Sequence, residues 1–341
     1  MSSIIEVQQK LLPDLLEVMQ KRHEILKYIR LMQPIGRRNL STSLGHSERV
    51  LRGEVQFLKE QNLVEFSTAG MSLTKEGAEL LKDLEDVMKE VLGLRVLESK
   101  LKEKLKIKEV IVVSGDSDTT PWVKKEMGRA CVLRIKQRLF GENIVAVTGG
   151  TTLAEVAEMM TPDSRGRSIL FVPARGGLGE RVENQANTIC AKMAEKASGD
   201  YRLLHVPDVV SNEAYNSFVA EPSIRDVLNL IKSSSMVVHG IGDAITMATR
   251  RRTDDEDMKK IIESHAVAEA FGYYFDEDGE VVHRVQTIGI QLSDLPAIHD
   301  VIAVAGGASK AIAIQAYLKQ APDTLLITDE GAAKELLKGY K

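Results

Sequence analysis

The feature that most constrains the fold is residues 144–152, where a short apolar run leads into two glycines and two threonines. The apolar, β-branched run predicts a buried strand, and paired glycines allow a tight turn with a close approach of the backbone to a ligand. Residues 153–160 continue with helical apolar spacing, and Thr151 or Thr152 is the expected N-cap. A strand, a glycine turn and a helix N-terminus together suit an anion such as phosphate. A loop of this kind, taken alone, is also an ordinary strand-to-helix turn.

The same pattern recurs along the chain. Apolar runs that end in glycine-containing loops occupy residues 110–116, 169–179, 236–242, 301–310 and 325–331. Near-continuous apolar strands that alternate with helices predict a parallel sheet covered on both faces. Ligands of such sheets bind beyond the carboxyl ends of the strands. Because several of these loops carry hydroxyl or cationic side chains, we expect a small anionic ligand.

Length and composition narrow the class of protein. A chain of 341 residues exceeds one ordinary core, and 43% hydrophobic with 28% charged residues indicates a globular, soluble protein of two or more domains. No long uncharged apolar run is present, so we expect neither a secretory signal nor a membrane span. Cys131 and Cys190 lie far apart in helical patterns, which predicts reduced, packed thiols in a cytoplasmic protein rather than a disulfide framework or a metal site.

The N-terminal region predicts a winged helix-turn-helix. After an amphipathic helix over residues 13–32, a short helix stops at Gly45, and Ser47 caps a second helix with an apolar inner face. Residues 63–73 predict a β-hairpin, a plausible wing, and Thr74 caps the next helix. That charged helix runs to residue 106 with a break near Gly93. It could pair with its counterpart in a second subunit or pack on its own domain.

Six residues of this region are the candidates for DNA contact. The exposed first turn of the second helix carries the candidates for base contact, and two arginines before it could hold phosphates. These residues are Ser47, Glu48, Arg49 and Arg52, and then Arg37 and Arg38. The alternative is a plain helical hairpin whose arginines are merely solvated.

Other charged residues of the α/β region have two interpretations. The run Arg250–Arg252 could match the C-terminal dipole of its helix or clamp a phosphate, because guanidinium groups fit phosphate oxygens. Lys310 follows a glycine pair and could reach a phosphate, although a lysine there is ordinarily exposed. Further upstream, Thr120 is the expected cap of a helix that opens at Pro121.

Two enzyme classes compete with a regulator. A sugar-phosphate isomerase or deaminase needs a positioned general base; Glu269, Asp243 and His239 are candidates, but no spacing among them specifies an acid–base pair. A dinucleotide oxidoreductase is less favoured, because Ile245 stands where a close-packing glycine or alanine is needed after Gly240 and Gly242. No P-loop is present.

Several long motifs in the same order resemble the SorC family of bacterial sugar-responsive repressors. Besides the winged helix-turn-helix, the motifs are residues 147–152, 173–179, 239–242 and 305–310, together with 33–38 and 114–118. The resemblance implies an α/β effector domain with a Rossmann-like parallel sheet, similar to sugar-phosphate isomerases. We therefore expect a DNA-binding domain over residues 1–93, including the connecting helix, and an effector and oligomerisation domain over residues 94–341.

The resemblance also implies a function and a ligand. It implies a repressor of a glycolytic operon, not an enzyme, that binds operator DNA as a dimer or tetramer and responds to fructose 1,6-bisphosphate. Gly149, Gly150, Thr151 and Thr152 would cradle one phosphate, with Lys310 nearby. Arg175, Arg250 and Arg251 would serve the rest of the bisphosphate, and Gln185 and Glu269 would bind sugar hydroxyls. We expect no cofactor, no metal and no membrane partner.

Overall fold

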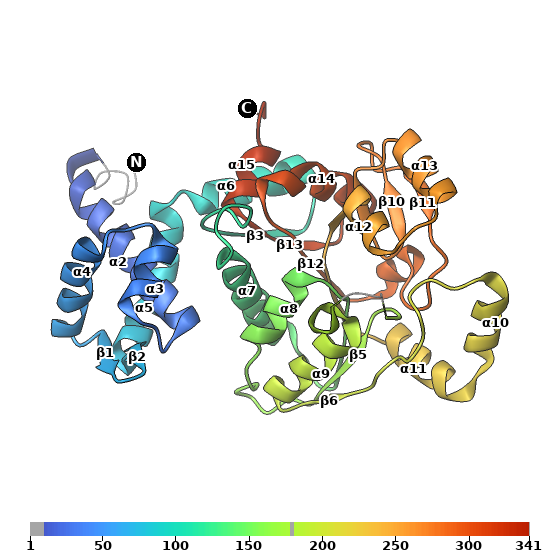
Figure 1. Cartoon of the computed structure of the whole chain (residues 1–341), viewed down its shortest axis with the longest axis horizontal. Coiled ribbons are helices and arrows are strands. Elements are labelled where there is room, and N and C mark those ends of the chain that lie inside the picture. Colours follow the sequence, from blue (N-terminus) through green and yellow to red (C-terminus); the bar gives the residue numbers. More distant parts are fainter. Residues whose placement is uncertain (1–9, 178–180, 341) are drawn as a thin grey trace. The chain divides into compact units, whose positions relative to one another are not determined.

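The computed structural model describes residues 10–177 and 181–340, and the chain contacts divide it into two units, Met1–Val96 and Leu97–Lys341. Leu178 and Gly179, which belong to the glycine-rich motif at residues 173–179, lie outside the described residues. The first unit contains helices and one hairpin, and the second contains two sheets with their helices (Figure 1). In the part of the chain that the structure describes, no helix is long and apolar enough to span a membrane.

The first unit has the predicted winged helix-turn-helix arrangement. Its elements are α2 (Pro13–Met32), α3 (Arg37–Leu44), α4 (Glu48–Glu60), β1 (Val64–Ser67), β2 (Gly70–Leu73), α5 (Lys75–Val91) and the start of α6 (Leu94–Leu105). Its core includes apolar side chains of α2, α3 and α4, namely Ile25, Ile29, Leu40, Leu51, Val55 and Leu58, and others from α5 and the hairpin. The predicted break in the charged helix is confirmed, because α5 ends before Gly93, which has a φ of 69°.

The second unit is built on a seven-stranded parallel sheet. Its strands are β3 (Glu109–Val113), β4 (Asn143–Val147), β5 (Ile169–Pro173), β6 (Asp200–Tyr201), β7 (Met236–His239), β12 (Asp300–Val304) and β13 (Leu325–Asp329). All neighbouring pairs are parallel, in the order β3-β13-β12-β7-β4-β5-β6. The predicted two-part α/β architecture is therefore confirmed.

This strand order places a topological switch between β4 and β7. From β4 the chain proceeds outward through β5 to β6, and from β7 it proceeds in the other direction through β12 to β13. The loops that follow two such strands diverge, which leaves a crevice at the carboxyl end of the sheet. The glycine loops at residues 148–152 and 240–242 lie at that point.

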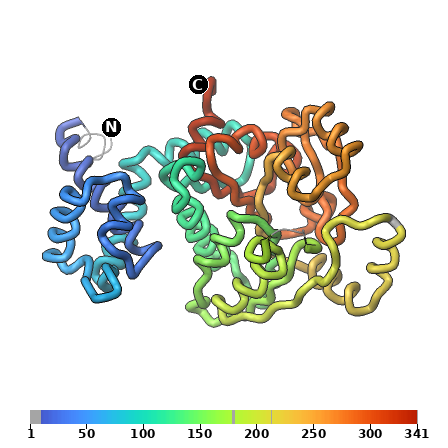
Figure 2. The backbone as a smooth tube through the Cα atoms, in the orientation of Figure 1, coloured from blue at the N-terminus to red at the C-terminus, as the bar shows by residue number. Residues whose placement is uncertain are grey.

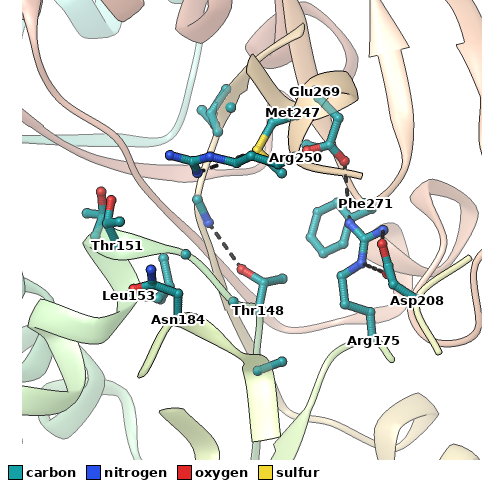
Figure 3. A pocket seen from close by; sticks show the side chains of 18 of the residues that line it. Thr148, Thr151, Leu153, Arg175, Asn184, Asp208, Met247, Arg250, Glu269 and Phe271 are labelled. Carbon is teal, nitrogen blue, oxygen red and sulfur yellow. Dashed lines mark hydrogen bonds and ion pairs between the residues drawn. The ribbon is translucent and has the colours of Figure 1, made fainter. Parts of the chain in front are cut away.

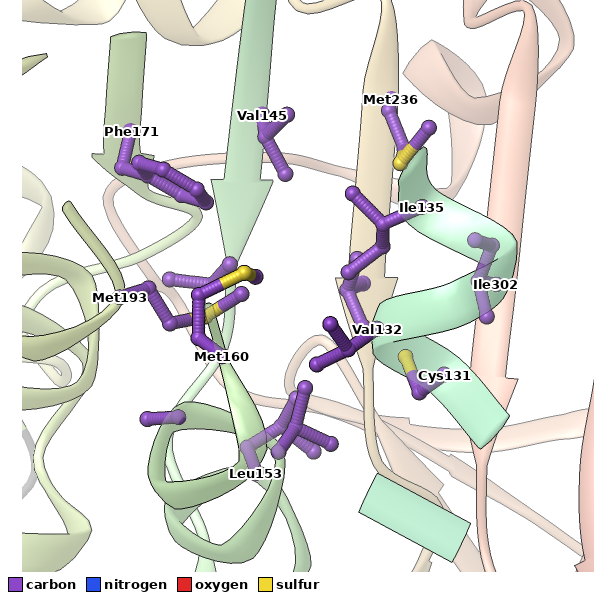
Figure 4. Packing of buried hydrophobic residues seen from close by; sticks show 14 of the residues in the cluster. Cys131, Val132, Ile135, Val145, Leu153, Met160, Phe171, Met193, Met236 and Ile302 are labelled. Carbon is purple, nitrogen blue, oxygen red and sulfur yellow. The ribbon is translucent and has the colours of Figure 1, made fainter. Parts of the chain in front are cut away.

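Helices α7 (Val123–Arg138), α8 (Thr151–Met159) and α9 (Ala186–Ala197) pack against one face of the sheet. Alternate strand residues such as Val145, Phe171 and Ile302 meet Cys131 and Met193 of these helices in a dry core (Figure 4). Burial raises the pKa of both thiols, that of Cys190 to about 12, as expected for packed cysteines.

A smaller antiparallel sheet was only partly predicted. It contains β8 (Gly242–Asp243), β9 (Ala268–Ala270), β10 (Tyr273–Phe275) and β11 (Val281–Arg284) in the order β11-β10-β9-β8. The acidic glycine turn at residues 276–279 predicts the hairpin of β10 and β11, but no local pattern predicts the pairing of this hairpin with β9 and β8. Helices α12 (Ala244–Arg250) and α13 (Asp255–Glu263) accompany this sheet. The remaining elements are η1 (Val182–Asn184), η2 (Leu292–Ala297), η3 (Ala308–Lys310), α14 (Ala311–Gln320) and α15 (Glu330–Leu336).

Between β6 and β7 the chain forms α10 (Asn212–Ala220) and α11 (Pro222–Lys232), drawn in yellow in Figure 2. Helix α11 contacts β4 and β5, whereas none of the described side chains of α10 is buried.

Two predictions of helix starts were wrong. Gly150, with a φ of 122°, occupies the N-cap of α8, so Thr151 and Thr152 are its first helical residues. The glycine adopts a backbone conformation that threonine would not tolerate, and the hydroxyls then lie in the first turn. Helix α7 begins at Val123, because Thr120 and Pro121 belong to a hydrogen-bonded turn in which Thr120 N bonds to Asp116 O at 2.8 Å.

Candidate functional site

The helix-turn-helix presents its six candidate residues on the surface. Gly45 has a φ of 66° at the end of α3, and the Ser47 hydroxyl accepts a hydrogen bond from Val50 N at 3.4 Å, which caps α4 as predicted. Arg37, Arg38, Ser47, Glu48, Arg49 and Arg52 are all exposed. Arg38 Nε lies 3.8 Å from Glu48 Oε1, an exposed pair too weak to immobilise either side chain.

The hairpin is held against the helix-turn-helix by backbone hydrogen bonds. Ile35 N donates to Met71 O at 3.0 Å, and Met71 N donates to Ile35 O at 2.8 Å. A Cβ on Gly70 would lie 2.8 Å from the backbone of Ile35, so only glycine permits this approach. The hairpin therefore has a fixed position beside the start of α3, as a wing requires.

In the second unit, all ten predicted ligand residues line one pocket. It encloses about 790 Å³ of space, part of it open to solvent, at the carboxyl ends of β4 and β7. The ten residues are Gly149, Gly150, Thr151, Thr152, Arg175, Gln185, Arg250, Arg251, Glu269 and Lys310.

One end of the pocket is the N-terminus of α8 (Figure 3). The first N–H groups of a helix have no acceptor within the helix and carry a partial positive charge. The space in front of Gly150 is open, whereas a Cβ on Gly149 would lie 2.6 Å from Asn184 O. A ligand can therefore approach the backbone at Gly150, and Gly149 lets the η1 segment pack against the loop.

Two cations lie near this helix N-terminus. Lys310, at the end of η3, donates from Nζ to Ile241 O at 3.3 Å, and Arg250 belongs to the last turn of α12. Burial lowers the pKa of Lys310, and the positive charges of Lys124 and Arg250 lower it further. Because a bound anion would offset both effects, this end of the pocket favours a negatively charged group.

The other end of the pocket holds a buried ion cluster. Arg175 donates to Asp208 through two nitrogens, Nε at 2.6 Å and Nη2 at 2.9 Å, and through Nη1 to Glu269 Oε1 at 3.4 Å. Arg251 donates to Asp208 at 3.2 Å, to Glu269 at 2.7 Å and to the Tyr274 hydroxyl at 3.0 Å. Although burial raises the pKa of Glu269, the two arginines lower it more, so Glu269 stays ionised.

The candidate bases for an enzyme are unsuited to proton transfer. Glu269 accepts from Arg251, Arg175 and Gly272 N on the single oxygen Oε1, and Asp243 caps α12 by accepting from Thr246 N at 2.8 Å. His239 is fully buried between Phe271 and Tyr317, and burial lowers its pKa to about 4. The site is therefore suited to binding a polar anion rather than to general acid–base chemistry.

Sequence reasoning missed several pocket residues. Thr148, Asn184, Asp208, Met247 and Phe271 also line the pocket. Thr148 belongs to the motif at residues 147–152, directly before the two glycines, so the sequence does mark its position. Asp208 gave a weaker signal, because the largely apolar residues 203–207 before it are not followed by a glycine turn. Among the described residues, no group of three or more His, Cys, Asp or Glu side chains could hold a metal ion.

Two family models match the chain, one for each kind of surface described above. The family model Sugar-bind, which describes a sugar-binding domain, matches residues 89–338, and the model of the CggR N-terminal DNA binding domain matches residues 18–88. The fold and the two surfaces thus define a transcriptional regulator with a DNA-binding part and a sugar-binding part. The chain belongs to the SorC/CggR family of such regulators.

The relatives cover the whole chain. The chain is 68% identical over 338 residues to the central glycolytic genes regulator of Bacillus subtilis (strain 168), which spans 99% of both chains. It is 67% identical over 341 residues to the protein of the same name from Priestia megaterium, which spans 100% of both. The solved structure of a SorC family regulator from Enterococcus faecalis is 49% identical and has a TM-score of 0.68, covering 71% of this chain and 99% of that one.

A full-length structure extends the likeness in fold. The sorbitol operon regulator SorC from Klebsiella pneumoniae is 19% identical and has a TM-score of 0.68, covering 99% of this chain and 100% of that chain. At this identity the likeness concerns the fold alone. The chain is accordingly a transcriptional regulator and not an enzyme.

Proposed function

We propose that this protein represses a glycolytic operon and that fructose 1,6-bisphosphate, bound in the pocket of the second unit, relieves the repression. The observation that carries the proposal is the pocket itself, in which a helix N-terminus and Lys310 lie at one end and a cluster with two arginines at the other. Relatives at 67% and 68% identity are named central glycolytic genes regulators. A sugar that carries two phosphates has the polarity and charge that such a pocket selects.

Each predicted residue has a role in this proposal. The backbone of residues 149–152 and the hydroxyls of Thr151 and Thr152 bind one phosphate together with Lys310. The N–H of Gly150 takes no part, because it donates to Asn184 O at 2.8 Å. Arg175, Arg250 and Arg251 serve the rest of the bisphosphate, and Gln185 and Glu269 form hydrogen bonds with sugar hydroxyls. In the described part of the chain, Glu269 accepts its side-chain hydrogen bonds on Oε1, so Oε2 is the oxygen suited to a hydroxyl.

The division of labour follows the two regions of the chain. Residues 1–93 bind operator DNA, with Ser47, Glu48, Arg49 and Arg52 at base edges and Arg37 and Arg38 at phosphates. Residues 94–341 bind the sugar and form the dimer or tetramer. Two recognition helices of such an oligomer would read a repeated or palindromic operator. Because DNA and phosphosugars are its targets, the protein acts in the bacterial cytoplasm.

Ligand and operator must be coupled energetically. The sugar can weaken operator binding only if it binds one arrangement of the oligomer better than another. Couplings of this kind are typically about 1–3 kcal/mol, equivalent to about 5- to 150-fold in affinity.

The deciding experiment measures binding to DNA upstream of a glycolytic operon while fructose 1,6-bisphosphate is titrated. The salt concentration is held constant, because phosphate contacts make DNA affinity steeply dependent on salt. Weakening or remodelling of a specific complex supports the proposal. If DNA never binds specifically, or the complex is insensitive to millimolar sugar, the proposal is wrong.

A further inference from the structure

The cationic side chains at the end of the pocket far from α8 are paired with carboxylates of the protein. At the far end, Arg175 and Arg251 face the two carboxylates of Asp208 and Glu269, so the four charges cancel. The side chains of this cluster are 2–10% exposed, and water screens them little. A second phosphate entering here meets a cluster whose positive charges are already neutralised by carboxylates.

Asp208 uses both oxygens on these arginines. Its Oδ1 accepts from Arg175 Nε at 2.6 Å, and its Oδ2 accepts from Arg175 Nη2 at 2.9 Å and from Arg251 Nε at 3.2 Å. The paired bonds to Arg175 have the fork geometry with which guanidinium groups bind carboxylates and phosphates. Asp208 therefore makes with Arg175 the contact that a ligand phosphate would make (Figure 3).

The two carboxylates are not equally replaceable. Glu269 belongs to β9, pairs with Tyr274 across the antiparallel sheet and also accepts from Gly272 N at 2.7 Å. Asp208 lies outside any strand, and within the described chain its carboxylate bonds only to the two arginines. A competing anion would therefore displace Asp208 rather than Glu269.

The backbone around Asp208 is held on both sides, because Pro207 forms a bridge with Gly177 and Val209 forms a bridge with Thr287. Asp208 N donates to Gly177 O at 3.0 Å, and a Cβ on Gly176 would lie 2.4 Å from Pro207 O. These contacts fix the main chain, so the carboxylate can leave Arg175 by rotation of its own side chain.

We propose that Asp208 is a specificity-determining residue, an internal counter-ion that the second phosphate of a bisphosphorylated sugar must displace from Arg175. The inference rests on the proposed sugar-phosphate ligand. A monophosphate bound at the α8 end leaves the Asp208–Arg175 pair in place. A bisphosphate gains Arg175 and Arg251 only after it has removed Asp208 from them, and this requirement sets its affinity relative to the monophosphate.

Calorimetric titrations of the full chain with fructose 1,6-bisphosphate and with fructose 6-phosphate test the proposal. The variants are Asp208→Asn, which removes the charge at constant shape, and Asp208→Glu, which keeps it. Asp226→Asn on the exposed face of α11 is the control for net charge. Asp208→Asn should raise the affinity for the bisphosphate by about tenfold, the effect of one charge-assisted hydrogen bond. Its affinity for the monophosphate should change far less, and Asp208→Glu and Asp226→Asn should keep the wild-type ratio.

A merely structural role predicts the opposite result. If Asp208 only holds the arginines in place, Asp208→Asn weakens the bisphosphate, and the inference is overturned while the proposed function stands. If the wild-type protein binds neither sugar, both proposals fall.

A measurement on the wild-type protein does not depend on the folding of any variant. Crystal structures of the two sugar complexes should show Asp208 bonded to Arg175 with the monophosphate and separated from it with the bisphosphate. An intact bidentate pair in the bisphosphate complex would overturn the inference.

Discussion

The backbone N–H of Gly240 donates a hydrogen bond to Thr148 Oγ1 across 3.3 Å, which joins the loops after β7 and β4. Thr148 N also donates to Val238 O at 3.1 Å, so the two loops are linked at consecutive points. These strands flank the topological switch, and the glycine loop that carries Gly149 and Gly150 begins one residue later. Thr148 therefore sets the position of the glycine loop at residues 149–152.

Replacement of Thr148 by valine tests this link. The side chain is buried, and the isosteric change leaves Gly240 N–H without its acceptor, which costs about 1–3 kcal/mol of stability. We expect a lower Tm in thermal denaturation and weaker binding of fructose 1,6-bisphosphate in calorimetry. Thr249→Val is the control, because Thr249 is exposed and its hydroxyl donates to Ile245 O within α12. Equal effects of both variants would refute the role of Thr148.

The close approach of Asn184 O to Gly149 leads to a second prediction. A Cβ there would lie 2.6 Å from Asn184 O, so Gly149→Ala must push the η1 segment, with Asn184 and Gln185, away from the glycine loop. Ligand affinity should fall at least about tenfold, because loop displacements of an ångström disturb several hydrogen bonds together. Gly177→Ala is the control, since its Cβ would have only an ordinary contact at 3.9 Å with Val206 O. Unchanged binding by Gly149→Ala would show that the loop yields without loss.

Glu269 predicts a dependence of stability on pH. Its pKa in the folded protein is below the ordinary value, so it stabilises the fold at pH values above that ordinary value. The contribution is lost as the pH falls below 4.5 through the lowered pKa. Glu269→Gln leaves two buried arginines with one carboxylate, and we expect a loss of about 3–5 kcal/mol at pH 7. Denaturation at pH values from 7 to 3 should show the two proteins converging, and a constant difference would contradict the assignment.

Much of the fold was predictable because the signals are local. Each apolar run that ends in glycine became a strand of the parallel sheet, and Ser47 and Thr74 cap the helices that they were expected to cap. Helix starts were harder where two residue types compete, as at Gly150, where the glycine conformation prevailed over the threonine hydroxyls.

Long-range pairing set the limit of prediction. Strand β8 has two residues, Gly242 and Asp243, and its partner β9 follows only after two helices, so no local pattern reveals it. Asp208 is the equivalent case in the pocket, because it follows the two-residue strand β6 and meets Arg251 only in the folded chain. The ten predicted ligand residues came from a family resemblance. Local patterns marked their loops but not the pairing of Arg175 and Arg251 with carboxylates.

Two substitutions should separate operator binding from sugar binding within one chain. Arg52 is exposed on α4, and Arg52→Ala should cost about 1–3 kcal/mol at the operator if the side chain makes a bidentate base contact. Calorimetry should show unchanged affinity for fructose 1,6-bisphosphate. Arg250→Ala should do the reverse, weakening the response to the sugar while leaving operator binding without sugar intact. Arg225→Ala on the exposed face of α11 is the control for loss of one positive charge. If Arg250→Ala impairs operator binding as much as induction, the pocket does not act through the sugar, and the assignment of Arg250 to the ligand is wrong.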